Sequence, residues 1–314
     1  MNEEYYAGLN RLRVAVQLKH RLFTHRDMIA AKATSPFRID KNFDMPTVPL
    51  VLSRIIQVLD DDHSSAQEME DLILHDPSLS ARILKLANSA LYSFRSEVKT
   101  ISHAIPLLGL NLVKSLAIGV SVFESFTKGA KGEAVHINNL WMHSFGVGML
   151  SQELWKKRGP RKEAEFAFLC GLLHDLGKVI FFKKAPMHYS FIFSQERNDK
   201  EPDISATEQQ YYGVNHASIG SLLAEHWGFP PELCTVIRKH HSTVDPNAPL
   251  VAAVSLADTI VRQTSIGRDG DRRANPDMSR LQALLRMGAE EFRQLRLYAE
   301  SRRKDVDDFF RMMP

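Results

Sequence analysis

A histidine and an aspartate stand side by side at His174-Asp175, directly after an apolar run. Apolar residues from Phe166 to Leu173 recur at helical spacing, which predicts that the pair lies near the C-terminal end of a buried helix that Gly177 ends. Burying an unpaired carboxylate costs several kcal/mol, so Asp175 requires a cation nearby, either a base or a metal ion. A single pair of this kind is more often a satisfied helix end than a metal ligand, so the remaining sequence must decide.

Further histidines and a late aspartate supply more nitrogen and oxygen donors on other predicted helices. They are His143, His216, the pair His240-His241, and Asp258. Together with His174 and Asp175 they form a coherent ligand set of imidazole and carboxylate without thiolate, which suits iron, manganese, cobalt, nickel or zinc. The two oxygens of one carboxylate can point to different ions, so Asp175 is suited to bridge a dinuclear site.

Composition indicates a globular protein and excludes some classes. The chain has 314 residues, 44% of them hydrophobic, enough for one large or two smaller domains. Its net charge of +3 is too small to indicate nucleic acid as a partner. It has no apolar run of membrane-spanning length and no charged-then-apolar leader, which predicts a soluble, cytoplasmic protein. Cys170 and Cys234 lie in apolar contexts and are predicted core residues.

The helical pattern divides the chain into four parts. Residues 1–43 form an extension with an imperfect helical stripe and an open role, residues 44–130 a first helical subdomain, residues 131–265 a second that carries the donors, and residues 266–314 a helical tail. Thr127 to Asn138 reads as the linker between the subdomains. Helices are predicted at 140–155, up to 174-175, at 186–197, 205–227, 231–241, 249–262 and 278–314. Alternating strand patterns are absent, so the predicted class is all-α.

Three polar features outside the donor set have simpler interpretations. Asn88-Ser89 follows an apolar helix and is predicted to close its end by side-chain hydrogen bonds. Glu208, two turns before His216, either orients a ligand imidazole or is a helix-face charge. Arginines in the tail alternate with acids and indicate a solvated helix face.

Four motifs carry a resemblance to a known family. They are Asp-Pro-Ser-Leu-Ser-Ala-Arg-Ile-Leu-Lys-Leu-Ala-Asn-Ser at 76–89, Ile-Ser-His-Ala-Ile-Pro-Leu-Leu-Gly at 101–109, Leu-Trp-Met-His-Ser at 140–144 and Gly-Leu-Leu-His-Asp-Leu-Gly at 171–177. Together they resemble the HDOD domain, the HD-related output domain of bacterial signalling proteins, from about residue 44 to 262. The resemblance implies an N-terminal helical bundle packed on a second bundle distantly related to the HD metal-dependent phosphohydrolases.

The second half more distantly resembles the HD-GYP cyclic-di-nucleotide phosphodiesterases, and the order of their ligands is intact. The resemblance implies that one ion is held by His143, His174 and Asp258, a second by His216, His240 and His241, with Asp175 between them. It also implies that Lys178 contacts phosphate. Asn139 replaces the glutamate that extends some related sites to three ions, which argues for two ions at most. No Gly-Tyr-Pro segment follows His241, so the substrate of those enzymes does not carry over.

Two functions follow as expectations. The first is a signalling protein that acts through protein partners and keeps a divalent metal centre, predicted to hold two ions, with iron favoured over manganese, nickel, cobalt and zinc. The second is a metal-dependent phosphohydrolase or phosphodiesterase on a phosphate-containing small molecule such as a nucleotide or cyclic dinucleotide. In the second, Asp175 and Lys178 are the predicted catalytic residues, with the metal-bound water as nucleophile.

Overall fold

The computed structural model describes residues 43–59, 65–92, 94–127, 133–194, 203–242, 245–271 and 277–312. Every regular element within these ranges is a helix, which confirms the predicted all-α class. The predicted N-terminal extension lies outside the described residues except for Phe43.

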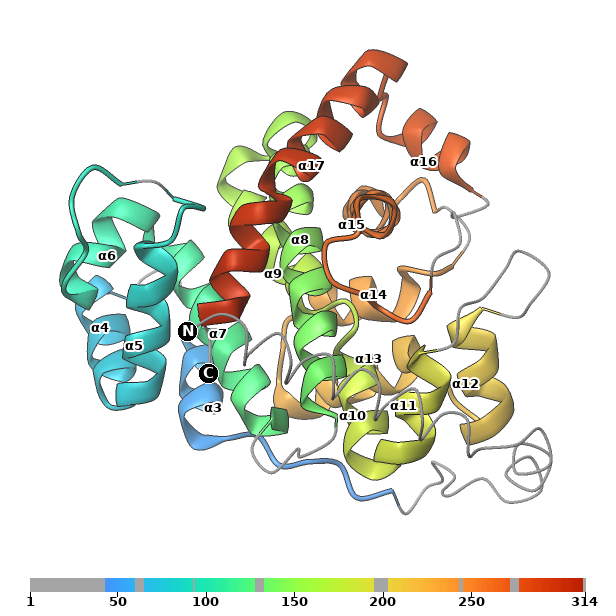
Figure 1. The fold of residues 1–314 in the computed structure, drawn as a ribbon, viewed down its shortest axis with the longest axis horizontal. Helices are drawn as coiled ribbons and strands as arrows, with labels where there is room; N and C mark the ends of the chain where they lie inside the picture. The colour runs from blue at the N-terminus through green and yellow to red at the C-terminus, as the bar shows by residue number, and fades with distance from the viewer. Residues whose placement is uncertain are drawn as a thin grey trace, which may run out of the picture.

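The first group of helices forms an N-terminal bundle (Figure 1). It consists of α3 (Leu50–Gln57), α4 (Ala66–Leu74), α5 (Pro77–Ala87), α6 (Ile101–Leu108) and α7 (Leu110–Thr127). Asp76 caps α5 by accepting hydrogen bonds from two backbone N–H groups, and Pro77 occupies the first helical position. Asn88 ends α5, and its side chain bonds the carbonyls of Leu84 and Val98, which confirms the predicted closure of this helix end.

The second group forms the bundle that carries the donors. It consists of α8 (Ala134–Arg158), the short 3-10 helix η1 (Arg161–Glu163), α9 (Ala164–Leu173), α10 (Leu176–Lys184), α11 (Pro186–Ser194), α12 (Ile204–Tyr212), α13 (His216–Trp227), α14 (Pro231–Lys239) and α15 (Pro249–Thr264). Helix α8 begins at Ala134, inside the predicted linker, because Ile137 is buried and extends its apolar side toward the N-terminus.

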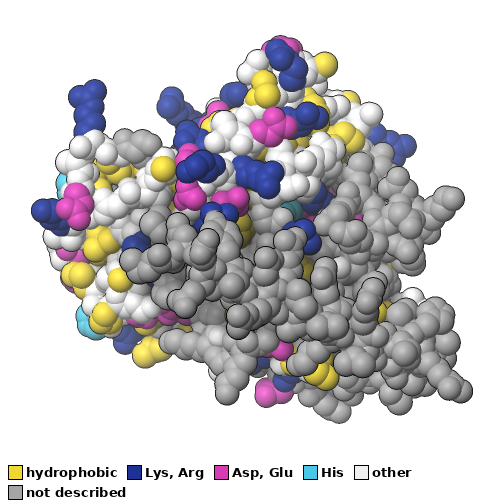
Figure 2. Space-filling model, viewed as in Figure 1, with side chains coloured by type: hydrophobic (Ala, Val, Ile, Leu, Met, Phe, Trp, Pro, Cys, Tyr) yellow, Lys and Arg dark blue, Asp and Glu magenta, His cyan; other side chains and the backbone are white. Residues whose placement is uncertain are grey.

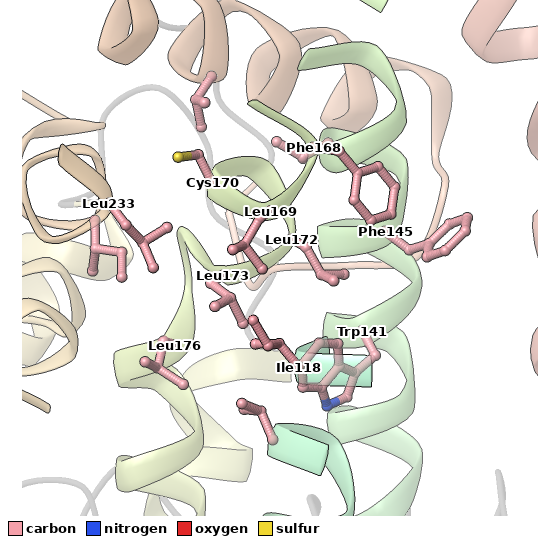
Figure 3. Close-up of a cluster of buried hydrophobic side chains, with 14 of the residues drawn as sticks. Ile118, Trp141, Phe145, Phe168, Leu169, Cys170, Leu172, Leu173, Leu176 and Leu233 are labelled. Atoms are coloured by element: carbon pink, nitrogen blue, oxygen red, sulfur yellow. The ribbon is translucent and has the colours of Figure 1, made fainter. Parts of the chain in front are cut away.

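Helix α9 is the centre of this bundle and is buried on nearly all sides. It contacts α7, α8, α14 and α15. Figure 3 shows Leu169, Leu172 and Leu173 of α9 near Ile118 of α7 and Trp141 of α8. One continuous hydrophobic cluster includes side chains of both bundles. The predicted packing of an N-terminal bundle on a second bundle is therefore confirmed.

Two C-terminal helices lie against the second bundle, where one helical tail was predicted. They are α16 (Met278–Leu284) and α17 (Ala289–Met312), and α17 packs on α8 and α15. The exposed side of α17 carries ion pairs such as Arg293 with Glu290, as the charge pattern predicted. Figure 2 shows basic and acidic side chains interspersed on the upper surface of the molecule.

Within the described residues, no single helix has the length and apolar composition needed to cross a membrane. Helices α6 and α7 meet that length and composition test only as a pair, and the chain bends by 117° between them.

Candidate metal centre

The turn between α9 and α10 presents His174 and Asp175 to the protein interior. Helix α9 ends at Leu173, His174 follows as its C-cap, and Asp175 directly precedes α10. The two residues are 0% and 2% exposed. The prediction that the pair lies at the C-terminal end of a buried helix is confirmed.

The prediction that Gly177 ends this helix is wrong. Gly177 lies in the first turn of α10 and faces α13. A Cβ atom at this position would lie 2.0 Å from the carbonyl oxygen of His216 and 2.8 Å from the backbone nitrogen of Gly220. The absence of a side chain therefore allows α10 and α13 to pack closely, and this contact brings Asp175 and His216 together.

The other predicted donors come from four further helices. His143 lies within α8, His216 is the first residue of α13, His240 is the C-cap of α14 with His241 next to it, and Asp258 lies within α15. Five segments that are distant in sequence therefore contribute to one site.

Helices α12 and α13 replace the single helix predicted at 205–227. Gly213 adopts a left-handed conformation with φ of 76° and ends α12. Asn215 then caps α13 by accepting a hydrogen bond of 2.9 Å from the backbone N–H of Ser218. This break folds the chain back, so that Glu208 of α12 lies beside His216.

The partner of Nδ1 fixes the tautomer of three imidazoles. His174 Nδ1 lies 2.7 Å from the Gly171 carbonyl, His240 Nδ1 lies 2.7 Å from the Ile237 carbonyl, and His216 Nδ1 lies 2.6 Å from Glu208 Oε2. Carbonyl and carboxylate oxygens only accept hydrogen bonds, so each Nδ1 must donate. Each neutral ring therefore carries its lone pair on Nε2.

These three lone pairs converge on the carboxylate of Asp175. His216 Nε2 and His240 Nε2 lie 3.3 and 3.6 Å from Asp175 Oδ1, and His174 Nε2 lies 3.3 Å from Asp175 Oδ2. Both Asp175 Oδ1 and His174 Nε2 are buried without a hydrogen-bond partner. Facing lone pairs repel unless a proton or a cation lies between them. Ligands about 2.1 Å from an ion stand roughly 3.0 to 3.4 Å apart, so the two separations of 3.3 Å fit a bound metal ion and the 3.6 Å separation of His240 lies just beyond that range.

The donors form two lobes that share Asp175. The three-histidine lobe contains Asp175, His216, His240 and His241, and the His143 lobe contains His143, His174 and Asp175; within each, the donor atoms lie within 4.8 Å of one another. Asp258 joins the His143 lobe through Oδ1, which is 3.0 Å from His143 Nε2 and 3.9 Å from His174 Nε2. The structure thus brings together all of the predicted ligand residues.

Glu208 contacts the backbone and the ring of the same donor histidine. It is fully buried, and its Oε2 accepts hydrogen bonds from both the backbone N–H and Nδ1 of His216. Its Oε1 accepts a hydrogen bond of 2.5 Å from the Tyr189 hydroxyl. Of the two interpretations open for Glu208, the geometry supports the one in which it orients a ligand imidazole.

Comparison with known proteins identifies the family. The family model of the HDOD domain matches residues 45–243. The chain belongs to the HDOD domain family. An uncharacterized protein of Treponema pallidum is 28% identical over 71% of this chain, and the match covers 43% of that relative, so this chain spans less than half of its length.

Two solved structures share the fold of this HDOD protein over most of their length. An HDOD domain protein of Geobacter sulfurreducens is 26% identical with a TM-score of 0.68, and the match covers 85% of this chain and 94% of that one. A candidate phosphohydrolase of Shewanella amazonensis is also 26% identical, with a TM-score of 0.66 and coverage of 86% and 95%.

The HDOD match ends at residue 243, and buried charges beyond it complete the site. Arg262 Nη2 lies 2.7 Å from Asp258 Oδ2, and Arg262 Nε lies 2.8 Å from Asp269 Oδ2. Lys178 Nζ lies 3.4 Å from Asp269 Oδ2 and 2.7 Å from Asp175 Oδ2. A continuous ion chain therefore runs Asp175, Lys178, Asp269, Arg262, Asp258. It joins the two carboxylates of the predicted ligand set.

The sequence interpretation missed Arg262 and Asp269. Arg262 stands four residues after Asp258 on one helix, a spacing that could have indicated the pair. Asp269 lies in the loop after α15 and has no comparable signal. The loop is held against α8 by a hydrogen bond from Arg268 N–H to the Asn139 carbonyl. Gly267 permits this contact, because a Cβ there would lie 2.3 Å from the backbone of α8.

Lys178 is not positioned to contact a substrate, because its charge is already paired inside the protein. Its side chain is fully buried, and its ammonium group contacts Asp175 and Asp269. Burial alone would lower the pKa of Lys178, but the two carboxylates raise it. The predicted contact of Lys178 with phosphate stays a prediction. In the structure its ammonium group forms an ion pair with Asp175.

Protonation states in the HDOD site favour cation binding. Burial alone would raise the pKa of the Asp175 carboxyl, but His174 and Lys178 hold it well below its usual range. Burial lowers the pKa of His240 to about 4 and that of His241 also falls well below normal. Burial alone would lower the pKa of His174, but the charge of Asp175 outweighs the burial, so the pKa of His174 is raised. The carboxylate is therefore ionised and two of the imidazoles are neutral at neutral pH, the forms that bind metal ions.

Proposed function

We propose that this HDOD protein is a regulatory protein whose second bundle binds a divalent metal ion and which acts through contacts with signalling partners. The observation that carries the proposal is the set of three Nε2 lone pairs directed at the Asp175 carboxylate in a buried site. Without a proton or a cation between them these lone pairs repel, and neutral imidazole with carboxylate is a donor set for first-row divalent metals.

The residues that would hold the metal belong to the two lobes that share Asp175. His216, His240 and His241 would bind on one side and His143, His174 and Asp258 on the other, the division that the prediction of two ions requires. Nitrogen and oxygen donors without thiolate suit Fe²⁺, Mn²⁺, Co²⁺, Ni²⁺ or Zn²⁺, with iron the ion expected from the HD-GYP resemblance. When bound, the metal supplies a Lewis acid that lowers the pKa of a coordinated water.

Burial favours the regulatory role over phosphoester hydrolysis. His174, His216 and His240 are fully buried, and His241 alone among the predicted ligands is partly exposed. A phosphate substrate needs access to the ion, whereas structural metal sites are closed. In addition, the Lys178 ammonium is engaged by two carboxylates and would have to leave them to contact a substrate.

The second candidate function is a metal-dependent phosphohydrolase or phosphodiesterase. The likeness to the candidate phosphohydrolase of Shewanella amazonensis supports it. In this case Asp175 would orient the metal-bound water, and the substrate would be a phosphate-containing small molecule such as a nucleotide or cyclic dinucleotide. Partly exposed His241 marks the side from which that substrate would enter.

One experiment separates the two functions. The protein is purified, reconstituted anaerobically with Fe²⁺ or Mn²⁺, analysed for bound metal, and assayed with cyclic dinucleotides, nucleotides and a model phosphodiester. Asp175→Ala is compared with Asp71→Ala, which removes an exposed carboxylate in the N-terminal bundle. Circular dichroism verifies that each variant is folded.

Metal bound in the wild-type and Asp71→Ala proteins but not in Asp175→Ala, without turnover, is the expected result. Turnover that Asp175→Ala abolishes while its fold is retained would establish the enzyme instead. Absence of stoichiometric metal after reconstitution would overturn both functions.

A further inference from the structure

We propose that the two lobes of the metal site are unequal, because Arg262 takes the place of a second ion's charge in the His143 lobe. The first ion then binds tightly in the three-histidine lobe, and the His143 lobe stays without tightly bound metal. This inference rests on the proposed metal-binding function and concerns residues beyond the HDOD match.

Carboxylate oxygens of the His143 lobe are already paired with protein cations. Asp258 Oδ2 lies 2.7 Å from Arg262 Nη2, and Asp175 Oδ2 lies 2.7 Å from Lys178 Nζ. Arg262 is buried with its side chain 6% exposed, so water screens this pair little. A divalent ion that enters this lobe meets two positive charges at its own ligands.

The three-histidine lobe offers the opposite environment. Asp175 Oδ1 faces His216 and His240 and has no hydrogen-bond partner. Glu208 places a further negative charge behind His216, on the ring nitrogen opposite the site. A cation is therefore attracted here more strongly than to the His143 lobe.

The charge count of the connected groups supports a single tightly bound ion. The carboxylates of Asp175, Asp258, Asp269, Asp271 and Glu208 contribute −5, and Lys178 with Arg262 contributes +2, which leaves −3. One divalent ion brings this to −1. A second would reverse the sign of the net charge in a buried site, where each added charge is costly because the local dielectric is low.

The test is metal stoichiometry measured by anaerobic titration of the metal-free protein with Co²⁺, followed by visible absorption and elemental analysis. We expect the wild-type protein to bind one tight equivalent, which His241→Ala loses and His143→Ala retains. Arg262→Gln should bind a second equivalent at least about tenfold more tightly than the wild type, because a unit positive charge near the ion is removed. Arg262→Lys, which keeps the charge but not both contacts, should not gain this second equivalent.

A matched control is Arg82→Gln, which breaks the 2.8 Å ion pair with Glu124 in the N-terminal bundle and should leave stoichiometry unchanged. Two equivalents of equal affinity in the wild type, or one equivalent lost in His143→Ala but kept in His241→Ala, would overturn the inference while the proposed function stands. If Arg262→Gln does not fold, the two histidine variants still decide. No bound Co²⁺ in any form would overturn both.

Discussion

Replacing Gly177 with alanine should destabilise the protein, although glycine-to-alanine in an open helix interior stabilises by about 0.5–1 kcal/mol. The added Cβ would lie 2.0 Å from the His216 carbonyl oxygen, where side-chain Cβ contacts essentially never fall below 3.0 Å. Helices α10 and α13 would have to separate by roughly the difference, about 1 Å. Overpacking costs about 1–3 kcal/mol, with the upper end expected where the obstacle is backbone. After the gain in helix propensity, the net loss is about 2 kcal/mol.

Gly119→Ala is the matched control, because this glycine also lies inside a helix, α7. Its Cβ would meet Leu172 Cδ2 at 2.4 Å, which is the end of a flexible side chain. Both residues line an apolar cavity of about 40 Å³, so Leu172 has space to move. Gly119→Ala should therefore leave stability unchanged or raise it by up to about 1 kcal/mol.

Urea and thermal unfolding of the chelator-treated proteins measure both effects. A loss of about 2 kcal/mol lowers the midpoint temperature by roughly 3 °C in a chain of this size. Gly177→Ala should also weaken metal binding, because its obstacle is the backbone of His216, a proposed ligand. A Gly177→Ala protein as stable as Gly119→Ala, with wild-type metal affinity, would refute the close contact of α10 with α13.

Three further predictions concern the site and its surroundings. Glu208→Gln removes the charge that orients a donor ring, so metal affinity should fall about 10- to 100-fold in a Co²⁺ titration with little change in secondary structure; unchanged affinity would contradict this role. Asn88→Ala leaves the backbone N–H and carbonyl of Val98, in the loop between α5 and α6, without their side-chain partner and should cost about 1–3 kcal/mol in urea unfolding without affecting stoichiometry. Metal-free protein should lose stability as pH falls from about 6.5 to 4. Burial lowers the pKa of His240 to about 4 in the folded protein, so His240 takes up a proton in the unfolded chain before it does so in the folded protein. This difference in pKa is worth roughly 3 kcal/mol of stability. The lowered pKa of His241 acts in the same direction and the raised pKa of His174 opposes it, so urea unfolding at pH 7.5 and 5.5 should show a net loss that His240→Gln reduces.

Helical periodicity and the resemblance were sufficient to predict which residues converge. His143 and Asp258 each lie on helices whose other buried residues are mostly apolar, and a polar side chain on such a face must meet another polar group. The identities of the donors therefore predicted their common location. The same reasoning predicted an orienting role for Glu208 as one of two alternatives, because a single sequence does not show which side of a helix turns inward at a break.

Glycines and loops account for what the sequence did not predict. A glycine after an apolar helix has the same local signature whether it ends the helix or permits contact with another helix, and Gly177 does the second. Asp269 depends on a loop that Gly267 and Arg268 hold against α8. The first contact joins residues 177 and 216, which are 39 apart, and the second joins residues 139 and 268, which are 129 apart, so no local pattern encodes them.

The burial of the donors also gives the regulatory proposal a physical basis. A metal ion in the three-histidine lobe would link the turn between α9 and α10 to α13 and α14, which also pack on one another. An ion at a thousand times its dissociation constant stabilises the form that binds it by about 4 kcal/mol. That energy would be available to hold these helices in one arrangement, and α15, which contacts α14, would pass the change to α17 at the protein surface. If the proposed function holds, a closed site of this kind would convert metal occupancy into a change of rigidity, and a partner that binds one arrangement better would bind according to the metal.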